Sequence, residues 1–281
     1  MEWRRLRARY LAANYELNPD KSEEELRQQE KILADFRDYQ EVVLWFEHDL
    51  FCQTNLIHLL NWFSHQSDWS DTTVSLICTD RFPGIDDFRG LGQLNPQQLA
   101  SLFAQRQEVT KVQLELAHAA WLAYGAPDPT AIEQLLLHDT SPLPFLKHAF
   151  ELHLQRFPYK SNGLGRIENL ALGIVAAGTT RFDEVFARFG STEPVYGLGD
   201  SQFWNALMRL SDCANPLLKI ERTSAIRDAQ VTITNLGHTA LSQQMDFVEL
   251  NGIDLWLGGV HLKGTSDVWR WDDEGHRLVM G

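Results

Sequence analysis

The sequence predicts an α/β protein, with a small, mostly parallel sheet flanked by helices and a C-terminal winged-helix-like α+β module. Two apolar runs, 42–46 and 73–79, enclose a helical pattern over 50–65, which is the order of a βαβ unit. Farther along, three helical patterns precede two strand patterns, the layout of a winged helix. The expected parts are an α/β domain with a helical extension (1–158), the winged-helix-like module (159–250), and a tail that docks on the first domain (251–281).

In the first part, helices are expected over 2–15 and 22–38, the second with a capping box formed by Ser22 and Glu25. The run 42–46 is apolar at every position, which predicts a strand buried on both faces. With only two convincing strands, the sheet is expected to obtain its edges from the tail, from another subunit, or from N-terminal sequence absent from this chain. Cap and first-turn signals predict later helices near Asn95-Pro96, Thr110, Asp128-Pro129 and Ser141-Pro142.

The second half of the chain alternates helical and strand patterns after an expected linker at 157–163. The helical patterns cover 166–177, 181–189 and 200–212, the strand patterns cover 217–222 and 229–234, and another helix begins at Leu236. Short strands are expected in the tail around Val260, Trp269 and Leu278.

Composition narrows the class of protein. The net charge is −13, and residues 159–281 hold 11 Lys and Arg against 15 Asp and Glu, which argues against nucleic acid as the main partner. Three separated cysteines without CxxC spacing favour a reducing compartment and argue against a thiolate zinc site, so no metal site is assigned. No secretory signal or membrane-length apolar run occurs, so a cytoplasmic protein without a membrane partner is expected. No phosphate-loop or nucleophile-elbow motif occurs, so no cofactor and no reaction can be assigned.

Ionisable side chains follow both predicted strands. Glu47, His48 and Asp49 come directly after the first strand, where open α/β folds collect ligands. These groups can transfer protons or hold a metal, although Asp49 alternatively caps the next helix. Asp80 and Arg81 end the second strand, and Asp80 is expected near Glu47 or, equally, bound to a turn.

Two candidate regions lie in the second half. In the tail, Asp254 and His261 accompany paired glycines and aromatic residues, so they either complete the pocket at Glu47 or serve only in domain docking. In the winged-helix-like module, a DNA-reading surface would use five outward-facing or wing residues. These are Gln202, Asn205, Arg209, Arg222 and Arg227. The acidic charge balance favours a structural or protein-contacting role over DNA reading.

Four separated segments, VVLWFEHDLF, FPGIDDFRGLGQL, APDPTAIEQLL and NGIDLWLGGVHL, together resemble the bacterial domain-of-unknown-function family 1835. The resemblance extends from about residue 37 to the C-terminus and implies an α/β domain with helical additions, without an activity. Relatives of this kind usually begin with an extra βα segment carrying a Gly-Asp-Ser-like turn. This chain has no such turn before Trp3, so a truncated or shortened start is expected.

The leading hypothesis is therefore a cytoplasmic protein that binds a small polar, nucleotide-like ligand at the strand C-termini near the domain junction. One alternative is a regulatory or adaptor protein whose winged helix contacts DNA or a protein. Another is an assembly protein, a homo-oligomer or one whose sheet is completed by a partner strand.

Overall fold

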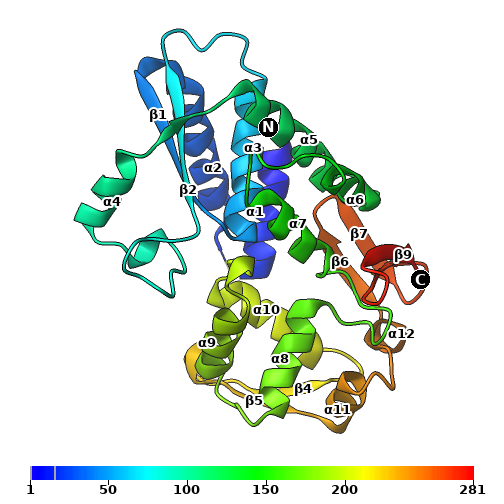
Figure 1. The fold of residues 1–281 in the computed structure, drawn as a ribbon. Coiled ribbons are helices and arrows are strands. Elements are labelled where there is room, and N and C mark those ends of the chain that lie inside the picture. Colours follow the sequence, from blue (N-terminus) through cyan, green and yellow to red (C-terminus); the bar gives the residue numbers. More distant parts are fainter. Residues whose placement is uncertain (1, 16) are drawn as a thin grey trace. The chain divides into compact units, whose positions relative to one another are not determined.

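The computed structural model describes residues 2–15 and 17–281 and confirms a mixed α/β protein with small sheets (Figure 1). The helices are α1 (Glu2–Tyr15), α2 (Pro19–Ala34), α3 (Leu50–Ser64), α4 (Pro96–Phe103), α5 (Lys111–Gly125), α6 (Thr130–Leu136), α7 (Leu146–Leu154), α8 (Arg166–Ala176), α9 (Phe182–Thr192), α10 (Asp200–Ser211), α11 (Asn235–Leu241) and α12 (Phe247–Asn251). Short 3-10 helices are η1 (Asp35–Asp38), η2 (Leu91–Gln93), η3 (Pro194–Tyr196) and η4 (Ile226–Asp228). The strands are β1 (Glu41–Glu47), β2 (Thr73–Thr79), β3 (Gln107–Glu108), β4 (Leu218–Glu221), β5 (Gln230–Ile233), β6 (Ile253–Leu257), β7 (Val260–Gly264), β8 (Trp269–Asp272) and β9 (Arg277–Met280).

Residue contacts divide the chain into two compact units. The first contains the described residues up to Trp45 together with 66–77 and 94–109, and the second contains 46–65, 78–93 and 110–281. Both the predicted module 159–250 and the predicted tail therefore lie in the second unit. Among the described residues, no helix combines the length and the apolar composition that crossing a membrane requires.

In the first unit, α1 and α2 pack together and are joined by ion pairs of Arg4 with Glu30 and of Arg5 with Glu23. The predicted capping box at Ser22 is wrong. The cap is Asn18, whose side chain accepts a hydrogen bond from the Lys21 amide at 3.0 Å, and a proline follows it. Because asparagine is a strong cap and proline suits the first helical turn, α2 begins before Ser22, which is buried.

The sheet of the first unit has the strand order β1-β2-β3 and is mixed rather than mostly parallel. Strand β3 pairs antiparallel with β2, with Ser75 opposite Glu108 and Leu76 opposite Gln107. Two residues are too few to show a periodicity, which is why the sequence did not predict β3. The prediction that β1 is buried on both faces is also wrong: β1 is an edge strand, and Leu44 is its one buried residue.

The second unit contains a core built from helices α8, α9 and α10 and the antiparallel β4–β5 hairpin. Stacked and tilted aromatic rings, among them Phe182, Phe189 and Phe203, fill its centre. The predicted helices and strands between 166 and 241 all occur, within a few residues of the expected bounds. The Ser141-Pro142 signal marks a turn that precedes α7, which begins only at Leu146.

The expected linker 157–163 is a packed loop. Phe157 and Asn162 are buried, and the Asn162 side chain donates to Asn169 Oδ1 at 2.8 Å and to the Ala240 carbonyl at 3.1 Å. The tail forms two antiparallel hairpins, β6–β7 and β8–β9. Trp271 of β8 joins this loop through backbone hydrogen bonds with Pro158 and Lys160. The loop and the tail therefore form one hydrogen-bonded structure.

Candidate functional site

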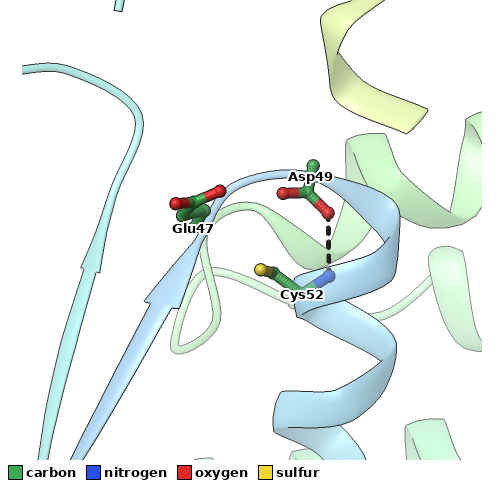
Figure 2. Close-up of side chains that lie close together, drawn as sticks. All are labelled: Glu47, Asp49 and Cys52. Carbon is green, nitrogen blue, oxygen red and sulfur yellow. Dashed lines mark hydrogen bonds between the residues drawn. The ribbon is translucent and has the colours of Figure 1, made fainter. Parts of the chain in front are cut away.

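The end of β1 and the start of α3 bring three possible ligand groups together in the second unit. A carboxylate oxygen of Glu47, a carboxylate oxygen of Asp49 and the Cys52 thiol all lie within 4.8 Å of one another (Figure 2). In a straight strand, Glu47 and His48 would face opposite sides. Residues 47 and 49 lie two positions apart and so share one side, and the bend at His48 and Asp49 ends the strand there and leads into α3, which brings Cys52 to the same side. We call Glu47, Asp49 and Cys52 the carboxylate–thiol cluster.

Asp49 is the N-cap of α3 and is buried. Its Oδ1 accepts a hydrogen bond from the Cys52 amide at 2.8 Å, so the capping role expected for Asp49 is observed. The same bond places Cys52 beside the carboxylate. Gly197 packs against the other side, where a Cβ would stand 2.2 Å from Asp49 Oδ1. The same conformation of Asp49 therefore caps α3 and places its carboxylate in the carboxylate–thiol cluster.

Glu47 is held by a loop that follows β2. Its Oε1 accepts a hydrogen bond from the Leu91 amide at 2.6 Å. Gly90 leaves room for this carboxylate only because it has no side chain: a Cβ there would stand 2.6 Å from both oxygens. The Gly90-Leu91-Gly92 segment, which lacks the spacing of a dinucleotide fingerprint, thus positions a carboxylate.

Gln53 connects the ends of the two strands. Its Nε2 donates to the Glu47 carbonyl at 2.7 Å and to Cys78 Sγ at 3.3 Å. Gln53 is almost fully buried, which fixes the backbone from which the Glu47 side chain extends. Sequence reasoning missed Cys52, Gln53, Cys78 and Gly90. Cys52 could have been found from the sequence, because it stands three residues after Asp49. The side chain of a helix N-cap accepts a hydrogen bond from the backbone amide at that position.

The electrostatics of the cluster favour the protonated forms of Glu47 and Cys52. Burial raises the pKa of Glu47, and the nearby Asp49 charge adds to the effect. Burial raises the pKa of Cys52 to about 12 and that of Cys78 to about 11. Both thiols are therefore neutral at physiological pH, so neither is an activated nucleophile. A cation placed among these groups would reverse that preference, because it stabilises their charged forms.

The other candidates have separate surroundings. His48 has a buried Nδ1 without a hydrogen-bond partner within residues 2–15 and 17–281, and its ring meets Phe145 edge-on at 6.1 Å. Asp80 and Arg81 are exposed and approach each other at 3.9 Å; the carboxylate that accompanies Glu47 is Asp49.

The tail candidates pair with each other. His261 Nε2 lies 2.7 Å from Asp254 Oδ1 across the β6–β7 hairpin, and its ring stacks on Trp256 at 4.4 Å. This pairing holds the pKa of Asp254 below its usual value. The contacts of His261 are thus within its own hairpin and do not involve the carboxylate–thiol cluster.

Most residues of the alternative DNA surface have a partner within the chain. Arg209 pairs with Glu168, and Arg227 approaches Asp200 at 3.8 Å. Arg222 Nη2 meets Met208 Sδ at 3.6 Å, and the Gln202 side chain accepts from the Gly199 amide. Asn205 also has an interaction partner.

No family model matches this chain, and no curated protein and no solved structure matches it.

Proposed function

We propose that this chain binds a divalent cation of the zinc type at the carboxylate–thiol cluster. The observation that carries the proposal is the convergence of three donor atoms of different chemistry within 4.8 Å. Hard ions such as Mg²⁺ and Ca²⁺ prefer oxygen alone, whereas Zn²⁺ accepts both carboxylate oxygen and thiolate sulfur. The mixed set Glu47, Asp49 and Cys52 therefore favours zinc.

Three protein ligands would leave a fourth tetrahedral position free, as in catalytic rather than structural zinc sites. That position would take a small polar ligand, which agrees with the ligand expected at the end of β1. Binding would also displace the proton from the Cys52 thiol, because the thiolate is the ligand.

The test is zinc titration of the metal-free, reduced chain by calorimetry, with Co²⁺ absorption as a reporter of sulfur ligation. We expect one ion per chain and at least a tenfold loss of affinity in Glu47→Gln, Asp49→Asn and Cys52→Ser. Asn at position 49 retains the helix cap, so its effect reports the lost charge. Cys213→Ser, at a thiol outside the cluster, is the matched control and should bind as the wild type does. Equal binding by all four variants, or no stoichiometric binding, would refute the proposal.

A second prediction separates the effect of how the Glu47 carboxylate is positioned from the effect of which ligand groups are present. Gly90→Ala keeps every ligand but places a methyl group against the Glu47 carboxylate, which must leave the Leu91 amide. We expect zinc affinity to fall about tenfold or more, as for loss of a group that orients a ligand. Gly92→Ala is the control, since a Cβ there meets nothing within 4 Å. Indistinguishable affinities of these two variants would contradict the assigned role of Gly90.

We also propose that α8, α9, α10 and the β4–β5 hairpin form a winged-helix-like module with a structural or protein-contacting role. The pairing of Arg209 with Glu168 supports this role, because it neutralises the one basic side chain of α10, whereas a helix that reads DNA needs several polar or basic side chains free for base contacts. The absence of a mobility shift with mixed DNA at low salt is the expected result, and a salt-sensitive shift lost in Arg209→Gln would overturn it.

We also propose that the chain belongs to the domain-of-unknown-function family 1835, and the four sequence segments named above support this proposal.

A further inference from the structure

A second candidate site lies elsewhere in the second unit. A cavity of about 230 Å³ is enclosed by three segments: the α7–α8 loop, the end of α10, and the chain from α12 into β6. This volume is below the roughly 300–1,000 Å³ of pockets for drug-sized ligands, so any occupant must be small.

The lining combines apolar side chains with charged groups and Asn251. Leucine, isoleucine and phenylalanine side chains contribute from all three segments. They are Leu164, Leu210, Phe247, Ile253 and Leu255. Cys213 also lines the cavity and provides a chemical reporter. An occupant with a compact hydrocarbon body would therefore bury apolar surface here.

Most charged side chains around the cavity have a partner within the protein. Glu168 pairs with Arg209, and Asp254 pairs with His261 at 2.7 Å and Lys263 at 3.8 Å. Asp212 also lines the cavity, but its side chain is exposed, so solvent and salt screen its charge.

Arg156 is the exception. It is half-buried, lines the cavity, and has no ion pair with an acidic side chain in the part of the chain that the structure describes. The planar donors of a guanidinium without a counter-charge match a carboxylate in a bidentate pair.

We propose that this cavity binds a small aliphatic carboxylate, whose carboxyl group pairs with Arg156 and whose hydrocarbon body packs on Leu210 and Phe247. The apolar lining accounts for the hydrocarbon part of the ligand, and the unpaired guanidinium accounts for its charge. This site is independent of the carboxylate–thiol cluster and of its metal.

The test uses 4-methylpentanoate, its neutral amide and inorganic phosphate as probes of the full-length chain. Binding is followed by calorimetry, and alkylation of Cys213, Cys52 and Cys78 is mapped by mass spectrometry. We expect the carboxylate to slow alkylation of Cys213 without affecting Cys52 and Cys78, and the amide and phosphate to bind at least tenfold more weakly.

Arg156→Gln should weaken carboxylate binding at least tenfold, whereas Arg188→Gln, at an exposed arginine outside this cavity, should leave it unchanged. The protection of Cys213 is measured on the wild-type chain, so the test does not depend on a folded Arg156 variant. Equal binding of acid and amide, equal protection by phosphate, or unprotected Cys213 would overturn the proposal.

Discussion

Replacing Asp246 with alanine is expected to lower the free energy of unfolding of the second unit by about 3–5 kcal/mol. The Asp246 carboxylate accepts hydrogen bonds from both Nη atoms of Arg270, at 3.1 and 3.2 Å, and it caps α12 through the Glu249 amide at 2.8 Å. The Arg270 side chain is only 6% exposed. The alanine variant therefore leaves a buried guanidinium without its counter-charge and a helix without its cap.

Urea unfolding followed by circular dichroism measures this effect. Lys111→Ala is the matched control, because the Lys111–Glu115 pair is exposed and such pairs contribute about 0–1 kcal/mol. The double variant Asp246→Ala/Arg270→Met should recover part of the loss, since it removes the unpaired charge. A loss for Asp246→Ala no larger than for Lys111→Ala would show that the buried pair does not stabilise the fold.

The second prediction concerns the contribution of His153 to the pH dependence of the unfolding free energy. Complete burial lowers the pKa of His153 from 6.5 to about 3, with a contribution from the nearby Arg156 charge. Its Nδ1 has no hydrogen-bond partner among the described residues, and its ring lies between Tyr124 and Phe157. The folded protein therefore keeps this imidazole neutral, whereas the unfolded chain protonates it below about pH 6.5.

Between about pH 6.5 and pH 3 the unfolded state holds the additional proton, so stability is lost as the pH falls. A shift of this size corresponds to a loss on the order of 5 kcal/mol across the whole range. His153→Phe retains an aromatic ring but cannot titrate, so its unfolding free energy should fall less steeply over that range. Parallel pH profiles for wild type and His153→Phe would contradict the assigned burial of a neutral histidine.

Local sequence patterns predicted many elements closely. The capped helices that begin after Asn95 and Thr110 start where expected, because their caps act within one helical turn. The strand 73–79 has the predicted bounds, as its β-branched run lies between polar turns. The candidate Glu47 was found because it directly follows the apolar run 42–46, and it proves to be the last residue of β1; Asp49 was found because it precedes a helix.

Other features depended on residues distant in the chain. The sequence could not show that Gly90 and Leu91 hold the Glu47 carboxylate, since these contacts span up to 44 positions. The pairing of Asp246 with Arg270 and the cavity at Arg156 arise in the same way.

The sequence by itself determined most of the helices and strands, because capping and hydrophobic periodicity act over a few residues, but not the short elements β3, α12 and β6. The tertiary structure decided which strand is an edge, which side chains lose contact with water, and which charges find a partner. Burial and pairing depend on distant segments packing together, and they set the pKa values and the donor geometry on which the proposed sites depend.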